Sequence, residues 1–357
     1  HKNNIMREAR EIFYDNKFIE LQDSNPYLLG CNNGVYDFTI GEFRAGRPED
    51  YLVKNTNNDY IPYDDLDSTI VHEINDFMTQ LFPVEELLNY MWSHLASTLI
   101  GTIENQTFNI YNGSGRNGKS VLVNLMGKII GDYKGTVPIT LITQKRRGIG
   151  GTSSEVVALK GVRYAVMQEP SKGDVINEGI MKEITGGDPI QGRGLYCDSI
   201  VFNPQFKLVV CTNTLFDINS NDDGTWRRIR VVEFLSKFKE EPISDDEDEP
   251  YQYKVDKKID EKFEKWKSTM LSMLINIAKK TKGNVEDCEM VMSKSNEYRG
   301  AQDYLAEFIK DKIVVDTEGI IKKQELYNEF KEWYAQNYGR TIPKAKELEA
   351  YINKKCC

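Results

Sequence analysis

One eight-residue motif limits what this 357-residue chain can fold into more than any other feature. It has the pattern G-x-x-x-x-G-K-S and consists of Gly113, Ser114, Gly115, Arg116, Asn117, Gly118, Lys119 and Ser120. In such a loop the glycines let backbone N–H groups turn inward around phosphate groups, the lysine reaches the terminal phosphates, and the serine hydroxyl ligates Mg²⁺. The loop needs a strand before it and a helix after it, so the motif predicts a strand–turn–helix unit that binds phosphate.

The residues around the loop meet this requirement. An apolar run at residues 108–111 predicts the strand, and residues 120–126 predict the helix. Further strand-like runs follow at residues 162–167 and 207–211, with a helix-compatible stretch between them at about 175–185. Strands that alternate with helices predict a mainly parallel sheet, and therefore an α/β fold.

The rest of the chain divides around this unit. Residues 25–63 predict short strands and turns, and apolar stripes at helical spacing follow, interrupted at Pro83. A helix is predicted from about 254 to 282, and the segment 293–357 predicts charged helices with a short strand at 313–315. We therefore expect three parts, which cover residues 1–100, 101–283 and 284–357.

Composition and charge exclude several classes of protein. No run approaches the ~18 apolar residues of a membrane-spanning helix, and no secretory leader opens the chain. The six cysteines contain no C-x-x-C pair and only three histidines are present, so we expect no zinc site and a soluble intracellular protein. The net charge is −9, but residues 240–249 carry seven acids, and the remainder holds 46 basic against 48 acidic residues. A solvated acidic loop is predicted there, and a local basic path for nucleic acid stays possible.

Two polar residues follow strands in the predicted sheet. Glu169 ends the apolar run at 162–167 with Gln168 before it, and a carboxylate there would polarise an attacking water and complete the Mg²⁺ shell. Because Gln168 stands where a second acid is usual, we expect the metal contact to run through water or Ser120. Asn213 follows the run at 207–211 and can hold the attacking water or the γ-phosphate; a plain polar residue at the end of a strand is the alternative.

Basic residues supply two further candidate sites. Arg227 and Arg228 either supply an arginine finger, because guanidinium offers phosphate a rigid charged fork, or form a solvated patch. The sequence Gly186-Gly187-Asp188 predicts the turn of a β-hairpin. Arg193 on that hairpin, together with Lys207, would place cations on a strand of nucleic acid, whereas a purely structural hairpin is the alternative.

The order of these motifs resembles superfamily 3 helicases, and most closely the poxvirus-type primase–helicases of large DNA viruses and some phages. Two flanking segments agree with this resemblance. Residues 28–38 (LLGCNNGVYDF) resemble the L-x-G-x-x-N-G-V-Y-D-L segment upstream of the ATPase in that family, and residues 325–334 resemble part of its downstream module. The resemblance covers about residues 25–340.

The resemblance implies an AAA+ P-loop ATPase core at 101–283, a small N-terminal α+β region with a helical collar at 1–100, and a C-terminal winged-helix-like module at 284–357. It implies ATP and Mg²⁺ as cofactors. By this resemblance the catalytic residues are Lys119, Glu169, Asn213 and Arg228, the metal residues are Ser120 and Glu169, and Arg193 is a DNA-binding residue. Lys207 is a DNA-binding candidate on the residues alone and is not part of the resemblance.

The resemblance also implies the partners and the place of action. We expect a homo-oligomeric ring, usually a hexamer, that moves 3′→5′ on single-stranded or forked DNA, without membrane association. Other replication proteins, such as a polymerase or a processivity factor, are expected partners, and a primase part is expected ahead of residue 1. The expected location is the host cytoplasm or a viral replication site.

Two other functions stay open at this point. A P-loop phosphotransferase such as a nucleotide kinase would need a lid with several arginines, and it has no use for the hairpin. An ATP-dependent initiator or loader would remodel DNA without processive unwinding. DNA-stimulated ATP hydrolysis separates a helicase from the first, and strand displacement on a forked duplex separates it from the second.

Overall fold

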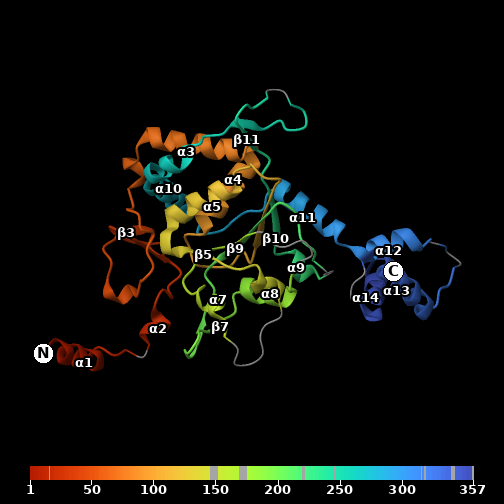
Figure 1. The fold of residues 1–357 in the computed structure, drawn as a ribbon, viewed down its shortest axis with the longest axis horizontal. Helices are drawn as coiled ribbons and strands as arrows, with labels where there is room; N and C mark the ends of the chain where they lie inside the picture. Colours follow the sequence, from red (N-terminus) through yellow and green to blue (C-terminus); the bar gives the residue numbers. More distant parts are fainter. Residues whose placement is uncertain are drawn as a thin grey trace. The chain divides into compact units, whose positions relative to one another are not determined.

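The computed structural model describes residues 1–15, 17–144, 152–168, 175–218, 222–243, 246–314, 316, 319–338 and 342–355. The chain forms two compact units, residues 1–296 and 297–357, each with a hydrophobic core of its own (Figure 1). The predicted boundaries after residues 100 and 283 both fall inside the first unit.

A five-stranded sheet forms the centre of the first unit. In spatial order its strands are β10 (Ile229–Glu233), β4 (Phe108–Asn112), β9 (Lys207–Thr212), β6 (Tyr164–Gln168) and β5 (Lys134–Thr136). All neighbouring pairs are parallel, which confirms the predicted α/β fold with a mainly parallel sheet. The three central strands read as near-continuous apolar runs because both of their faces are covered. Since β9 lies between β4 and β6, the carboxyl ends of these three strands meet at one edge.

Four long helices gather together beside the sheet (Figure 1). They are α3 (Ser68–Leu81), α4 (Glu85–Ser97), α5 (Lys119–Ile130) and α10 (Ile259–Thr281). α10 contacts the other three, and the ring of Phe77 on α3 lies 5.5 Å from that of Trp266 on α10. The apolar stripes predicted before residue 100 and after residue 254 therefore pack into one core together with the sheet.

Smaller elements surround this core. The helices are α1 (Lys2–Ile12), α2 (Phe18–Leu21), α6 (Thr140–Thr143), α7 (Ser154–Val157), α8 (Glu178–Gly186), α9 (Asp223–Trp226) and α11 (Glu289–Ala301), and 3₁₀ turns lie at Pro48–Asp50, Tyr63–Asp65 and Gly131–Tyr133. The strands β1 (Leu28–Cys31), β2 (Gly34–Asp37) and β3 (Glu42–Arg44) form an antiparallel sheet, β7 (Ile190–Arg193) pairs antiparallel with β8 (Ser199–Phe202), and β11 (Lys237–Lys239) pairs parallel with β12 (Gln252–Lys254).

The predicted hairpin exists, but its turn lies elsewhere. Gly186 is the last residue of α8, and Gly187 caps this helix with a left-handed φ of +95°. The hairpin of β7 and β8 begins after the cap, and its turn is formed by residues 194–198. The prediction that Gly186-Gly187-Asp188 forms the hairpin turn is therefore wrong, because the same glycine signal ends a helix here.

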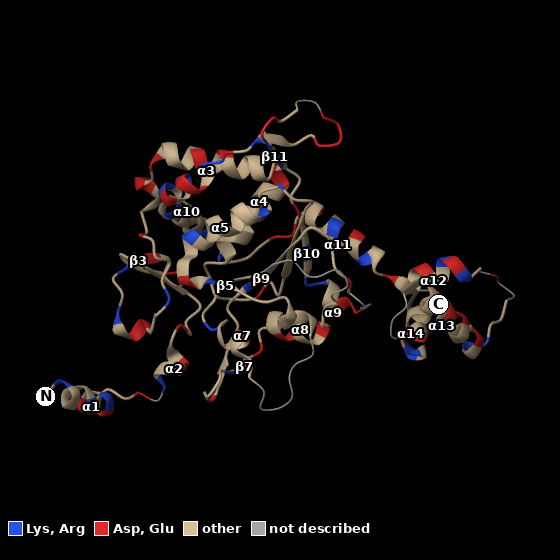
Figure 2. Ribbon diagram, in the orientation of Figure 1, with Lys and Arg blue, Asp and Glu red and all other residues tan. Residues whose placement is uncertain are grey.

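The acidic segment is a loop, as predicted. It joins β11 to β12 and carries a run of acidic residues away from the helices (Figure 2). Two of its acids pair with flanking lysines, Glu249 with Lys239 at 2.5 Å and Glu240 with Lys257 at 2.8 Å. In the part of the chain that the structure describes, every helix is too short or too polar to cross a membrane.

The second unit is a small helical module. It contains α12 (Tyr304–Lys312), α13 (Lys323–Tyr338) and α14 (Ala345–Lys355), which surround an aromatic core that includes Phe308, Phe330 and Trp333. Ile313 and Val314, which were predicted to belong to a short strand, lie outside any strand, and Val315 is outside the described residues.

Candidate nucleotide-binding site

The phosphate-binding motif forms the turn between β4 and α5, as the sequence predicts. β4 ends at Asn112 and α5 begins at Lys119. Gly115 and Gly118 have φ values of +85° and +84°, where a residue with a Cβ atom is strained. A Cβ atom at Gly118 would also lie 2.3 Å from Cδ1 of Leu81, so this position needs glycine for space as well.

The start of α5 can receive an anion. Gly118 occupies the N-cap position and offers no side chain to the first-turn N–H groups. The N–H groups of a first helical turn have no partner within the helix, and the helix dipole adds positive potential there. A phosphate group fits this end of α5 for both reasons.

Lys119 lies at the bottom of the loop with 6% of its surface exposed. Its ammonium donates to the Gly113 carbonyl oxygen and, at 3.0 Å, to Oδ1 of Asn213. The structure thus brings together two predicted site residues from the carboxyl ends of β4 and β9. Phosphate oxygens of a bound nucleotide would meet the same ammonium as these protein oxygens do.

A cavity of about 270 Å³ opens over this contact. Its lining consists of Gly115, Arg116, Asn117, Gly118, Lys119, Ser120, Val121, Val123, Cys211, Thr212 and Asn213. Burial raises the pKa of the Cys211 thiol to about 11, so this thiol stays neutral at physiological pH. The charged side chains of the lining are therefore those of Arg116 and Lys119, and Lys119 is the buried one.

A magnesium ion fits the donors that the described residues offer. Ser120 is exposed in the first turn of α5 and lines the cavity, so its hydroxyl oxygen can serve as one ligand. Within the described ranges, no group of three or more His, Cys, Asp or Glu side chains could hold a metal ion alone. The Ser120 hydroxyl beside the phosphate-binding loop suits Mg²⁺, because this ion takes most of its ligands from water and substrate phosphates. Glu169 lies outside the described residues, as does the side chain of Gln168.

Lys237 on β11 is a cation at this loop that the sequence analysis did not single out. Its ammonium donates to Oγ of Ser114 and, at 3.2 Å, to the Gly115 carbonyl oxygen. The next residue, Phe238, donates its backbone N–H to the Arg116 carbonyl oxygen at 2.8 Å, which fixes β11 against the loop. Lys-Phe-Lys at 237–239 is a sequence signal for a strand with two cations on one face, but nothing in the sequence places that strand beside the loop.

The two candidate finger arginines differ in exposure. Arg228 is 8% exposed, and it donates to the Gly224 carbonyl oxygen at 2.5 Å and to Oε1 of Gln106 at 3.3 Å. Arg227 is exposed and donates to the same Gln106 oxygen at 3.0 Å. The Arg228 carbonyl oxygen accepts from Phe108, the first residue of β4, whereas the phosphate-binding loop follows the last residue of β4. Both arginines therefore lie at the edge of the sheet opposite to the loop of their own chain.

Arg193 is the last residue of β7 and is exposed beside the hairpin turn. Its Nε donates to the Cys197 carbonyl oxygen at 3.0 Å, and its backbone N–H donates to Oγ of Ser153 at 3.0 Å. The turn also carries Tyr196, which is 95% exposed with a φ of +58°. Tyr196 was not among the predicted site residues, because the turn that carries it was predicted at residues 186–188.

Lys207 does not join Arg193, and the structure corrects this prediction. Lys207 is 5% exposed, and its ammonium donates to the carbonyl oxygens of Ile100 and Thr102, both at 2.5 Å. Burial, followed by the charge of Arg163, lowers the pKa of Lys207 to about 7. A strand of nucleic acid has no access to this side chain, which instead fixes the segment between α4 and β4.

Comparison with known proteins supports one family. Residues 1–93 match a family model described as "D5 N terminal like", and residues 111–228 match a model described as a family of unknown function, DUF5906. A candidate helicase of Acanthamoeba polyphaga mimivirus, L207/L206, is 37% identical over 98% of this chain and 37% of its own length. The chain belongs to the D5-like primase–helicase family. The match at residues 111–228 spans the phosphate-binding loop, the hairpin of β7 and β8, and the two arginines Arg227 and Arg228.

Other D5-like relatives cover the chain in the same way. A candidate helicase of Invertebrate iridescent virus 3, 121R, is 30% identical over 99% of this chain, and a candidate primase of African swine fever virus, C962R, is 26% identical over 94%. The chain spans 40% and 36% of the lengths of these two relatives. Among solved structures, the A form apo structure of the NrS-1 C-terminal region has a TM-score of 0.46 at 12% identity, over 84% of this chain and 62% of that chain.

Proposed function

We propose that this chain is the helicase part of a primase–helicase, a motor that hydrolyses ATP and moves 3′→5′ on single-stranded DNA to separate strands at a viral or phage replication fork. The contact between Lys119 and Asn213 carries this proposal, because it joins a phosphate cradle and a polar strand end in one cavity. The names of the relatives, candidate helicase and candidate primase, support the same role.

The residues divide the chemistry of hydrolysis as follows. The loop N–H groups and Lys119 bind the phosphates, and Lys237 adds positive charge at the other side of the loop. Asn213 orients the attacking water, and Glu169 accepts its proton. Ser120 and Glu169 would hold Mg²⁺, which would supply positive charge to the phosphate groups.

The arginine finger comes from a neighbouring subunit in this proposal. Arg227 and Arg228 lie at the start of β4, and the loop lies at its end, roughly 13 Å of strand away. An arginine of the same chain therefore has a poor path to its own γ-phosphate, whereas a ring of identical subunits, usually six, can present it to the next site. Of the pair, Arg227 is the exposed one and suits this contact in trans.

The hairpin of β7 and β8 holds the DNA strand. Arg193 offers a cation for a backbone phosphate, and Tyr196 offers an exposed ring on which a base can stack. Residues 101–283 act as the AAA+ core in this scheme, and the helices of the second unit act as the winged-helix-like module.

A forked duplex with one labelled strand tests the proposal. Wild-type protein is expected to release the labelled strand only with ATP and Mg²⁺, and only when the fork carries a 3′ single-stranded tail. Glu169→Gln is the control, because it keeps ATP binding and loses the base that activates water. ATP hydrolysis without strand release would contradict unwinding and would favour an initiator that remodels DNA.

A further inference from the structure

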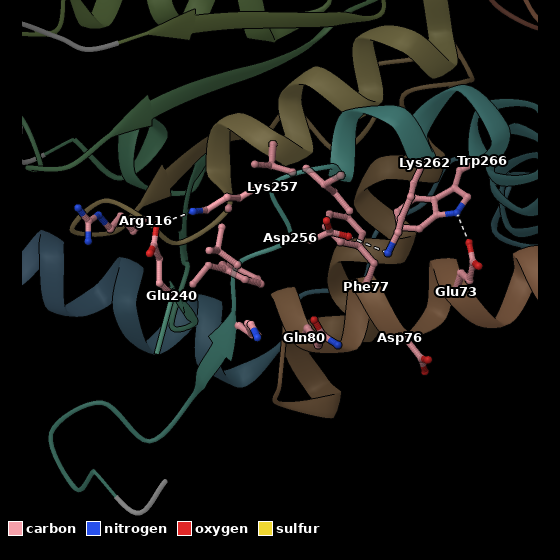
Figure 3. A pocket seen from close by; sticks show the side chains of 16 residues that line it. Glu73, Asp76, Phe77, Gln80, Arg116, Glu240, Asp256, Lys257, Lys262 and Trp266 are labelled. Carbon is pink, nitrogen blue, oxygen red and sulfur yellow. Dashed lines mark hydrogen bonds and ion pairs between the residues drawn. The ribbon is translucent and has the colours of Figure 1, made fainter. Parts of the chain in front are cut away.

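The acidic loop between β11 and β12 lies beside the phosphate-binding loop. Its residues 240–249 carry seven acids and no base, a composition that by itself predicts a solvated loop. Lysines nevertheless hold both of its ends. Glu249 pairs with Lys239 on β11 at 2.5 Å. Figure 3 shows Glu240 with Lys257, their charged atoms 2.8 Å apart, at a cavity that Arg116 of the phosphate-binding loop also lines.

Hydrogen bonds within the acidic loop fix the position of Glu249. The carboxylate of Asp246 accepts the backbone N–H groups of Asp248 at 3.1 Å and of Glu249 at 3.3 Å. The side chain of Gln252 on β12 donates to the same carboxylate at 2.7 Å and accepts from the Ile243 N–H at 2.9 Å. The fold of the loop therefore places Glu249 at Lys239, in addition to the attraction between the two charges.

Glu249 and the phosphate-binding loop line one cavity of about 390 Å³. Its lining consists of Ser114, Gly115, Arg116, Lys237, Lys239 and Glu249. Three of these described residues are cationic and one is acidic. Alternate residues of a strand share a face, so Lys237 and Lys239 lie on the same side of β11, where Lys237 donates to Ser114 and Gly115.

Stability alone gives little reason for the pair of Lys239 and Glu249. Their side chains are 31% and 35% exposed, and an ion pair that is open to water contributes little to the free energy of unfolding. The main effect of the Glu249 carboxylate is therefore on the electrostatic potential of the cavity beside the phosphate-binding loop.

We propose that Glu249 acts as an electrostatic brake, because its carboxylate neutralises Lys239 and so lowers the affinity of the phosphate-binding loop for polyphosphates such as ATP. This regulation rests on the proposed function, which takes the loop as the site of the triphosphate. With three cations and Glu249, the cavity lining has a charge of +2, and without the carboxylate it has +3. An anion on the loop experiences this difference, since charges interact over a Debye length of ~10 Å at ~0.1 M salt.

Isothermal titration of ATP and of inorganic tripolyphosphate into the full chain, with Mg²⁺ present, tests the brake. Glu249→Gln should bind both ligands about threefold more tightly than the wild type at ~0.1 M salt, because one opposing charge is removed. At ~1 M salt the Debye length is ~3 Å, and the gain should fall below about 1.5-fold.

Two further variants and a control separate charge from structure. Lys239→Gln should weaken both ligands about threefold at ~0.1 M salt, and the double variant Glu249→Gln/Lys239→Gln, whose cavity lining returns to +2, should match the wild type. Glu264→Gln is the control, because Glu264 also pairs with a lysine at 2.5 Å. That lysine, Lys128, lies roughly 13 Å along α5 from Lys119, so the control should change either affinity less than about 1.5-fold.

The possible results separate the brake from the proposed function. Unchanged affinities in Glu249→Gln, a gain that persists at high salt, or an equal gain in Glu264→Gln would overturn the brake and leave the phosphate site intact. Wild-type protein that binds neither ATP nor tripolyphosphate would overturn the proposed function itself.

Discussion

Lys119 and Lys207 are both buried beside the central sheet, and their partners separate their roles. Lys119 and its partner Asn213 both line an open cavity, so phosphate oxygens can reach the ammonium. The partners of Lys207 are two carbonyl oxygens inside the protein, which a ligand cannot reach. We therefore expect Lys119 to act in binding and Lys207 to act in stability.

The pH dependence of stability tests the role of Lys207. Its pKa is about 7 in the folded chain and about 10.4 in an unfolded chain, so between these values the unfolded state binds more protons. The free energy of unfolding therefore gains a contribution from Lys207 that rises with pH in this window. In Lys207→Met this contribution is absent. Urea unfolding of both proteins at pH 7, 8 and 9 should show their difference changing by about 1 kcal/mol per pH unit. Parallel pH profiles would contradict this assignment.

Arg227 and Arg228 give a matched pair of variants. Arg227→Ala should fold like the wild type, bind ATP, and lose hydrolysis by a factor of ~10³–10⁵, the loss typical of a removed arginine finger. Arg228→Ala should instead lower the free energy of unfolding by ~1–3 kcal/mol, because its buried guanidinium donates to Gly224 and Gln106. Steady-state hydrolysis and urea unfolding measure the two effects.

The trans arrangement makes a further demand on Arg227. Arg227→Ala protein and Lys119→Ala protein should each be inactive alone. When the two are mixed so that their subunits exchange, ATP hydrolysis should return, because some interfaces then join an intact phosphate-binding loop to an intact Arg227. A reversed pattern, in which Arg228→Ala alone loses hydrolysis at unchanged stability, would assign the finger to Arg228.

Single residues differ in how well the sequence predicts them. Lys119 and Asn213 were predictable because each follows a strand of a parallel sheet, and the carboxyl ends of such strands share one edge. Lys207 was not, because its environment depends on the Ile100–Thr102 backbone, which only tertiary packing brings to it. Lys237 was missed for the same reason, since β11 meets the loop from far along the chain.

At the scale of elements, local sequence signals predicted whether a segment is a helix, strand or turn better than they predicted its position in the fold. The loop, its strand and its helix follow from one motif together with the apolar runs around it. The glycines at 186–187 indicated a residue with positive φ, and in the structure this residue is Gly187. Such a residue is common both in hairpin turns and at the ends of helices. The buried side chains of Ile180 and Ile184 show that the preceding segment is an amphipathic helix, so the glycines end it.

The hairpin of β7 and β8 carries a prediction on DNA binding. Arg193→Ala should lower the slope of log affinity for single-stranded DNA against log salt by about 0.7, because one phosphate contact is lost. Tyr196→Ala should weaken affinity by ~1–3 kcal/mol at an unchanged slope, because a stacked base carries no charge. Fluorescence anisotropy at several salt concentrations measures both, and Val201→Ala, an exposed apolar residue on β8, is the control. If Arg193→Ala and Tyr196→Ala both match the control, the hairpin does not face the strand.

At the scale of the whole molecule, the sequence predicted the helices and strands better than it predicted which of them share one compact unit. The helices before residue 100 and the helix after residue 254 were predicted separately, yet they share one core with the sheet, so the first unit continues to residue 296. Periodicity reports which face of a helix is buried but not against what it packs. The net charge of −9 also says little about the site, because a large share of it lies in the loop between β11 and β12.

We expect this chain to hydrolyse ATP at the loop of residues 113–120 and to couple hydrolysis to single-stranded DNA. Steady-state ATP hydrolysis by the full chain, with and without single-stranded DNA, measures both properties. Wild-type protein should hydrolyse ATP faster when DNA is added, and Lys128→Ala, a surface variant near the end of α5, should behave the same. Lys119→Ala should show no hydrolysis in either condition. Undiminished hydrolysis by Lys119→Ala, or a wild-type rate that DNA does not change, would contradict this expectation.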